Sequence, residues 1–304
     1  MRYFRITNSI GESVDVTSDD TLLTNPEGLG IERDTTFRRV GNRFITVSSK
    51  PKQLPFSGKI LFFGDDPYAQ YKDTVRILSK GPLYLEYNPF GKLTTSGLYD
   101  VPDYYTKKCE LSKLTKTELD NDYGCLWSEI ELIPLTPWYI IVAQEVVAED
   151  QNESVGNTNM KFPFTFPVKF SSTRPMQASF DFTTSTMTEG ACRLRLKGPF
   201  ENPVWHHYVG SREVSSGRIG TTKNRCVVHA GEYLWVDNTT DPYRIFIGDE
   251  FGKTLIRDVY QLSDFSTERF ITIQPGYRND IVFSVESASH IDVRAEVYQY
   301  YESV

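Results

Sequence analysis

Apolar and polar positions alternate along much of this chain, most clearly near its end. The stretches Ile281–Val285 and Ile291–Val297 place apolar side chains at every second position, and charged residues fill the gaps in the second stretch. This period of two marks strands with one buried and one wet face. Pro275-Gly276 supplies the turn that precedes them. We therefore predict that the chain ends within a β-sheet whose charged positions form a solvated face.

The first half shows the same signature in several stretches. Within Cys125–Ile133, the even-numbered residues from Leu126 to Leu132 point one way, and the odd-numbered ones, Trp127 among them, point the other way. The predicted strands of this half are Tyr3–Thr7, Arg43–Ser48, Gly58–Phe63, Pro82–Tyr87, Tyr104–Leu114 and Cys125–Ile133. We expect the last two to pair as antiparallel neighbours around the polar turn Asp120–Asp122.

One stretch has helical spacing instead. Its apolar positions recur every three or four residues, at Tyr68, Tyr71, Val75 and Leu78. Asp66 is suited to cap this helix and Pro67 to occupy its first turn. Gly81 is expected to stop it. The pattern predicts a short amphipathic helix that lies against a sheet.

A polar stretch divides the chain. Glu149–Asn159 holds a single aliphatic residue and predicts a linker, and the apolar element Trp138–Val142 before it is interpreted as a hinge. Beyond the linker, short predicted strands alternate with turn residues, as in β-sandwiches and jelly rolls. These strands are expected within 162–170, 180–182, 192–196, 234–237 and 243–247, with turns at Gly198-Pro199, Asn202-Pro203 and Asn238–Pro242.

The predicted fold class is therefore mainly β, with two domains, as a chain of 304 residues favours. Residues 1–145 form a β-rich domain with one amphipathic helix, residues 146–162 form a linker, and residues 163–304 form a β-sandwich. The aromatic content of 13% fits this β-rich composition.

Charge and composition restrict the classes of partner and the compartment that we expect for this protein. A net charge of −7 disfavours nucleic acid or an anionic membrane as the main partner. No apolar run reaches the roughly 18 residues of a membrane span. The N-terminus alternates like a strand and lacks the apolar core of a signal peptide, so we expect synthesis and folding in a cytosol. The four cysteines are widely spaced, which favours buried thiols over a disulfide or zinc site.

The sequence offers little catalytic chemistry. His206 and His207 are adjacent, so a strand would point them to opposite faces and prevent joint chelation. Carboxylate pairs such as Asp249-Glu250 and Asp65-Asp66 are better explained as turns and helix caps. The usual nucleophile, phosphate-loop and zinc motifs are missing. We predict that the chain is not an enzyme and needs no cofactor or metal, and that the basic cluster Arg38 to Arg43 forms a solvated or inter-subunit face.

Four aromatic residues are candidate contacts for a ligand or partner, because β-sandwiches often stack sugar rings on exposed aromatic side chains. They are Trp205, Tyr208, Trp235 and Tyr243. The alternative for Trp235, which lies in an alternating stretch, is a place in the core or at a strand edge.

Taken together, the order of elements resembles the distal tail protein of siphophages, in the style of its lactococcal-type members. In the first half, the resemblance rests on the first strand, Gly28-Leu29-Gly30, the helix from Asp66 to Leu78, Leu83–Tyr87, and the segment from Trp127-Ser128-Glu129 to Pro137-Trp138-Tyr139. In the second half, it rests on Gly198–Pro203, Ala230–Asp237 and Gln274-Pro275-Gly276, which are similar to the family's galectin-like domain.

This resemblance implies a structural virion protein at the phage tail tip. It implies a homo-hexameric ring of N-terminal domains, which contacts tail tube protein on one side and tape-measure or tail-associated proteins on the other. Some relatives also carry receptor-binding proteins on an inserted arm, for which Glu149–Asn159 is short. The sugar-binding motifs of true galectins have no counterpart here, so lectin activity does not carry over. Two other hypotheses stay open: a carbohydrate-binding β protein that aids attachment to a cell wall, and an accessory protein of a glycoside hydrolase or esterase.

Overall fold

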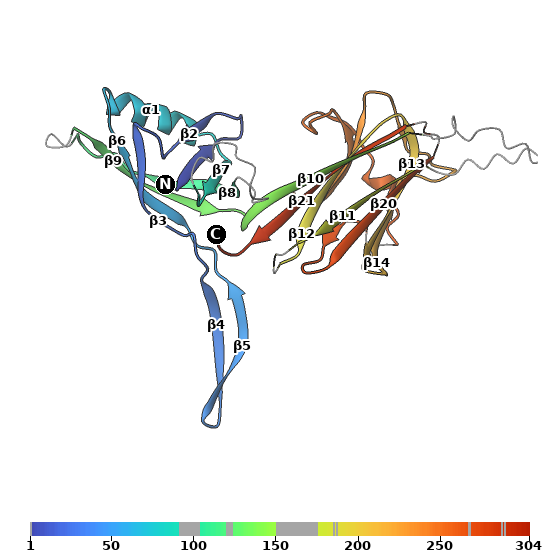
Figure 1. Cartoon of the computed structure of the whole chain (residues 1–304), viewed down its shortest axis with the longest axis horizontal. Coiled ribbons are helices and arrows are strands. Elements are labelled where there is room, and N and C mark those ends of the chain that lie inside the picture. Colours follow the sequence, from blue (N-terminus) through green and yellow to red (C-terminus); the bar gives the residue numbers. More distant parts are fainter. Residues whose placement is uncertain are drawn as a thin grey trace, which may run out of the picture. The chain divides into compact units, whose positions relative to one another are not determined.

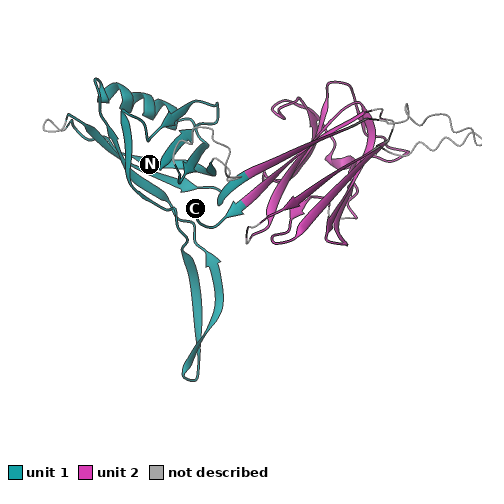
Figure 2. Cartoon of the chain, in the orientation of Figure 1, with its two compact units in different colours: residues 1–140, 300–304 teal, residues 141–299 magenta. Residues whose placement is uncertain are grey.

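The computed structural model describes residues 2–90, 104–119, 124–149, 176–184, 186, 188–266, 269–286, 288 and 290–304. These residues form strands and one α-helix, which confirms the mainly β prediction. The chain divides into two compact units, coloured separately in Figure 2. Unit 1 comprises Met1–Ile140 and Tyr300–Val304, and unit 2 comprises Ile141–Gln299.

Unit 1 is built on a curled antiparallel sheet (Figure 1). Its strand order is β2-β1-β7-β8-β9-β6-β3. At the two ends of this order, Thr17 bridges Leu22, and the Leu23 N–H donates to the carbonyl of Val16 at 2.7 Å. The sheet therefore curls until its last strand meets the residues that follow its first. The strands are β1 (Tyr3–Thr7), β2 (Ser13–Asp15), β3 (Thr21–Glu27), β6 (Phe56–Phe62), β7 (Leu83–Asn88), β8 (Tyr105–Leu114) and β9 (Leu126–Pro134).

The predicted strands of this unit are confirmed with small shifts of their ends. β8 and β9 pair antiparallel, and the even-numbered residues of β9 from Leu126 to Leu132 are all buried, as the alternation predicts. The turn predicted at 120–122 lies outside the described residues. The sequence did not predict β2, β3 or the strand at Arg33–Val40, because their residues show no regular alternation.

The helix α1 (Pro67–Leu78) begins where the sequence predicts. The carboxylate of Asp66 accepts the N–H of Ala69 at 2.9 Å and so caps the first turn. The prediction of its buried face was partly wrong, because Val75 is exposed while Thr74 and Ile77 are buried. Gly81 does not end the helix, which stops at Leu78, three residues earlier.

A two-stranded hairpin completes unit 1. It consists of β4 (Arg33–Val40) and β5 (Arg43–Pro51), joined by Gly41 and Asn42. Within the described part of the chain, the two strands pair only with each other, and they extend away from the curled sheet (Figure 1). Almost every side chain on them is exposed, so packing contributes little to their stability.

Unit 2 is a β-sandwich of two antiparallel sheets. One sheet has the order β18-β17-β16-β12-β21-β10, with β19 beside β12, and the other has the order β11-β20-β13-β14, with β15 beside β13. The first sheet comprises β10 (Trp138–Glu149), β12 (Gly190–Lys197), β16 (Tyr233–Asp237), β17 (Arg244–Gly248), β18 (Leu255–Asp258), β19 (Thr272–Ile273) and β21 (His290–Tyr301). The second comprises β11 (Met176–Thr183), β13 (Phe200–Val209), β14 (Arg212–Arg218), β15 (Val227–Val228) and β20 (Arg278–Glu286); the 3₁₀ turn η2 spans Tyr260–Leu262.

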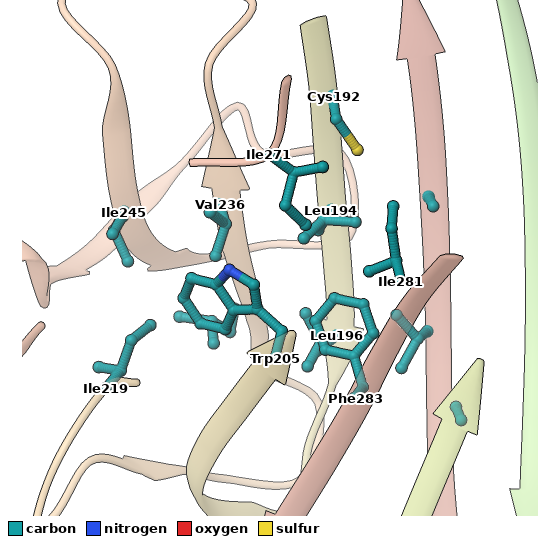
Figure 3. Close-up of a cluster of buried hydrophobic side chains, with 14 of the residues drawn as sticks. Cys192, Leu194, Leu196, Trp205, Ile219, Val236, Ile245, Ile271, Ile281 and Phe283 are labelled. Carbon is teal, nitrogen blue, oxygen red and sulfur yellow. The ribbon is translucent and has the colours of Figure 1, made fainter. Parts of the chain in front are cut away.

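The alternating strands predicted near the chain end are confirmed, but they do not pair with each other. β20 and β21 follow each other in sequence but belong to opposite sheets, and the apolar positions of both enter the same core. Figure 3 shows part of this core, in which the indole of Trp205 lies among Leu196, Val236 and Phe283. The sandwich prediction therefore holds, whereas the galectin-like detail stays a prediction.

One local prediction was wrong, and another stays untested. Asn202-Pro203 is not a turn between strands but a β-bulge inside β13, where the register shifts between Glu201 and Val204. The apolar stretch Trp138–Val142 forms the beginning of β10, and the boundary between the two units falls within it, so its interpretation as a hinge stays a prediction.

The domain limits proposed from the sequence stay predictions. Of the expected linker 146–162, residues 146–149 complete β10, and the remainder lies outside the described residues. The last five residues belong to unit 1, where the ring of Tyr301 meets that of Tyr105 edge-on at 5.3 Å. The N–H of Val304 donates to the carbonyl of Leu29 at 3.2 Å.

Candidate functional site

The hairpin of β4 and β5 presents apolar side chains to solvent on both faces. On one face Arg39 lies opposite Phe44, and Phe37 lies opposite Thr46. On the other face Ile45 pairs with Arg38, and Val40 pairs with Arg43. The large apolar side chains that are more than half exposed on this hairpin are Phe37, Val40, Phe44, Ile45 and Val47. Such a concentration of exposed apolar groups marks an interaction surface.

The same hairpin is strongly basic. Arg33–Pro51 carries five basic residues and one acidic residue. Among the described residues, no carboxylate lies within ion-pair distance of Arg38, Arg39 or Arg43. These arginines are the cluster that the sequence assigned to a solvated or inter-subunit face. They lie at the far end of the hairpin, next to its two-residue turn.

Sequence reasoning missed β4 and the apolar character of this hairpin. Gly41-Asn42 between two runs rich in β-branched and aromatic residues is a hairpin signal that could have found it. The missing clue was alternation, which needs one buried face, whereas this hairpin buries neither.

Burial removes Trp205 from the four aromatic candidates. Its side chain is 0% exposed, and its Nε1 donates to the carbonyl of Arg269 at 2.9 Å. The ring lies 6.3 Å from that of Phe283 in the core. It contacts protein on all sides and leaves no face for a ligand.

Trp235 is 5% exposed although it points away from that core. It stacks on Phe246 at 6.3 Å, and the guanidinium of Arg193 lies 5.5 Å from the centre of its ring. Its Nε1 donates to the carbonyl of Asp249 at 3.0 Å. Trp235 therefore belongs to a small packed cluster on the outer side of β16 and β17, in line with the alternative considered for it.

The two tyrosines are more accessible. Tyr208 is half-buried and stacks on His206 at 6.2 Å. Tyr243 is 52% exposed and packs edge-on against Phe270 at 4.9 Å. The four candidates thus do not form one site, and Tyr243 is the one with the largest accessible ring.

The titratable groups outside these surfaces have structural roles. His206 and His207 point to opposite faces, as predicted, and His207 is buried against Asn279. Burial lowers the pKa of His207. Asp249 accepts the N–H groups of Lys253 and Thr254 in a turn, and these hydrogen bonds lower its pKa. Among the described residues, no group of three or more His, Cys, Asp or Glu side chains could hold a metal ion.

A polar hollow of about 360 Å³ lies between α1 and β2. On its wall, Arg5 donates to the carboxylate of Asp15 at 2.8 Å and to the hydroxyl of Tyr3 at 2.8 Å. Burial, followed by the hydrogen bond to Asp15, raises the pKa of Tyr3 to about 12. These side chains already satisfy one another, which favours a role in fixing the edge of the sheet over a role in chemistry.

The cysteines are all unpaired thiols, and Cys109, Cys192 and Cys226 are buried. None of the helices in the described part of the chain is long and apolar enough to cross a membrane.

Comparison with known proteins assigns the first unit. Residues 3–135 match the family model described as "Distal tail protein, N-terminal domain". No curated protein matches the sequence. Among solved structures, a chain of the phage P2 baseplate in its activated conformation with calcium is 15% identical over 100% of both chains, with a TM-score of 0.64. The Dit protein of phage SPP1, described as a hub of the adsorption apparatus in phages that infect Gram-positive bacteria, is 11% identical. That likeness covers 97% of this chain and 98% of the SPP1 protein, with a TM-score of 0.53.

The likeness to these structures extends over both units and shows a shared fold, while the family match covers most of unit 1. Residues 3–135 therefore belong to the distal tail protein family, whose members are virion components at the phage tail tip.

Proposed function

We propose that six copies of this chain form a ring that joins the tail tube to the host-adsorption device, and that the β4–β5 hairpin is the segment that contacts the neighbouring copy. The observation that carries this proposal is the hairpin itself, which exposes five large apolar side chains. The number six follows the resemblance to distal tail proteins. The likeness to baseplate and hub structures supports the assembly role.

Two physical properties of the hairpin argue against its functioning as an isolated element. An isolated two-stranded ribbon is marginally stable in water, and no other described strand pairs with the outer edge of β4 or of β5. Unpaired edges offer N–H and C=O groups to another chain. Packing against a neighbouring copy would bury the apolar side chains and would also give the N–H and C=O groups of the strand edges hydrogen-bonding partners.

Charge supports a second copy as the neighbour. With five basic residues and one acidic residue, the hairpin contributes +4 to a chain of net charge −7, so the remainder carries −11. A basic hairpin that meets the acidic remainder of the next copy gives a complementary head-to-tail contact. Contacts of this heterologous kind close into rings when the rotation between copies allows it.

A pair of matched substitutions tests the proposal. Phe44 on the hairpin is 73% exposed and Phe251 on unit 2 is 72% exposed. We expect Phe44→Asp to abolish the ring and Phe251→Asp to leave it intact, as measured by light scattering after size-exclusion chromatography and by negative-stain microscopy. For a protein that assembles only with its partners, the same variants are incorporated into virions by complementation of a phage that lacks the gene. Rings that form equally with Phe44→Asp would refute the role of the hairpin.

The partners of the ring follow from the same proposal. One face would meet tail tube protein, the other tape-measure or tail-associated proteins, and unit 2 would be available for receptor-binding proteins. We propose a structural role with no catalytic step. Pull-down of tail tube protein by the wild-type chain and by Phe44→Asp would separate loss of the ring from loss of tube contact.

A further inference from the structure

A groove of about 380 Å³ opens on unit 2 beside the first residues of β17. Its lining combines aromatic and polar side chains from β17, β18 and η2. Those that carry the argument are Tyr243, Arg244, Leu255, Asp258, Tyr260 and Gln261. The volume lies within the range of small-ligand pockets, about 300–1,000 Å³.

The aromatic wall is held in place by packing within unit 2. Tyr243 contacts Phe270 edge-on, with ring centres 4.9 Å apart, and Tyr260 stacks on the same ring at 6.5 Å. The guanidinium of Arg269 lies 4.8 Å from the centre of the Tyr260 ring and donates to its hydroxyl at 2.5 Å. Because these contacts fix both rings, little conformational entropy would be lost when a ligand packs on them.

Planar polar groups stand beside the rings. One carboxylate oxygen of Asp258 accepts the N–H of Tyr260 at 2.9 Å, and no described residue hydrogen-bonds its second oxygen. The guanidinium of Arg244 lies 5.3 Å from the centre of the Phe246 ring. Within the described residues, neither Arg244 nor the amide of Gln261 has a hydrogen-bonding side-chain partner. The groove therefore offers a carboxylate, a guanidinium and an amide, each with unused hydrogen-bonding capacity.

We propose that this groove binds a neutral sugar unit of a bacterial surface polysaccharide. A pyranose ring has an apolar C–H face, which packs on an aromatic ring, and hydroxyl groups at its edge, which need donors and acceptors in one plane. Tyr243 supplies the accessible ring, and Asp258 and Gln261 supply the polar groups. Among the lining side chains, the positive charge of Arg244 is matched by the negative charge of Asp258, so the lining has no excess charge to favour an anionic ligand.

This proposal does not rest on ring formation, because every residue that carries it belongs to unit 2. It also differs from the sugar pocket of galectins, whose motifs the sequence lacks. Of the four aromatic candidates, it retains Tyr243 and adds side chains that the sequence alone gave no reason to group.

The test uses the full-length chain on an array of bacterial surface glycans, with neutral hexose and N-acetylhexosamine oligosaccharides in one set and poly(glycerol phosphate) in another. The neutral oligosaccharide with the strongest signal is then titrated by calorimetry. We expect Tyr243→Ala to weaken its binding by about tenfold or more. Tyr277→Ala is the matched control, since Tyr277 is 63% exposed on unit 2 and is not part of the groove.

Three further measurements make the outcome decisive. Asp258→Asn keeps an acceptor for the Tyr260 N–H and should also weaken binding, which separates sugar recognition from damage to the turn. Thermal unfolding of Tyr243→Ala confirms that the variant is folded. Phe44→Asp should bind the sugar like wild type, so failure of the ring and failure of the groove are distinguishable. Binding to no neutral glycan, binding to poly(glycerol phosphate) alone, or equal binding by Tyr243→Ala and wild type would each overturn the proposal.

Discussion

Replacing Gly217 with alanine tests the assignment of Trp205 to the core of unit 2. The two residues are direct cross-strand partners on β14 and β13. A Cβ atom at position 217 would lie 2.0 Å from Cζ2 and 2.1 Å from Cε2 of the indole. Carbon atoms in contact are separated by about 3.5–4.0 Å, so the added methyl group overlaps the ring. The backbone of Gly217 does not have the positive φ that favours glycine, which leaves this overlap as the expected cause of any effect.

The magnitude follows from the surroundings of the ring. The fully buried indole has no solvent to move into, and its Nε1 is held by the carbonyl of Arg269. Overpacking of a core costs about 1–3 kcal/mol. Displacing the ring from its acceptor adds about 1–3 kcal/mol for a buried N–H without a partner. We therefore expect Gly217→Ala to lower the free energy of unfolding by about 3 kcal/mol or more.

Urea denaturation followed by tryptophan fluorescence measures the loss, and hydrogen exchange of the β13 and β14 amides locates it. Gly30→Ala is the control, because no heavy atom lies within 4 Å of its added Cβ, and it should change stability by less than about 0.5 kcal/mol. Combining Gly217→Ala with Trp205→Leu removes the overlap, so the double variant should lose less stability than the sum of the single variants. A Gly217→Ala protein as stable as wild type, or strict additivity in the double variant, would show that Trp205 does not pack there.

The remaining predictions concern the helix cap, pH and thiol reactivity. Asp66→Ala should cost about 1 kcal/mol in urea denaturation because the cap of α1 is lost, whereas Asp65→Ala should be nearly neutral. Because burial lowers the pKa of His207 in the folded state, protonation favours unfolding. The stabilisation from neutral His207 is complete above the pKa of the unfolded state, near 6.5, and is lost as the pH falls below it. The unfolding temperature of wild type should therefore decrease more steeply with falling pH than that of His207→Gln. With a thiol reagent at pH 8, Cys125 should react before unfolding and Cys109 only after it, because burial raises the pKa of Cys109 to about 12.

Sequence patterns predicted the elements that bury one face. Apolar and polar residues alternate in β9, β20 and β21, because each of these strands has one buried face and one more accessible face. The start of α1 is marked by the capping residue Asp66. The same logic fails at β4, where neither face is buried, and at Trp235, whose outward side chain is covered by Arg193. Alternation shows that the two faces of a strand differ. It does not show that a charged side chain, such as that of Arg193, covers an aromatic ring on the outer face.

The groove could not be predicted for a different reason. Tyr243, Leu255 and Tyr260 come from separate segments that meet only because β17 pairs with β18 and η2 follows it. Their side chains show no periodic signal, since each lies at the end of an element or in a connection. Tyr243 alone was named from the sequence, as one of four aromatic residues that could contact a ligand.

The path of the chain between its two units has a mechanical consequence. β10 leaves unit 1 at Ile140, and β21 returns to it at Tyr300, so unit 2 is an insertion within unit 1. A tension applied to unit 2 is thus shared by the covalent connection at Ile140 and by the packing of Tyr300–Val304 within unit 1. For a protein at the tip of a phage tail, this double attachment divides the load that a host surface would place on a single linker.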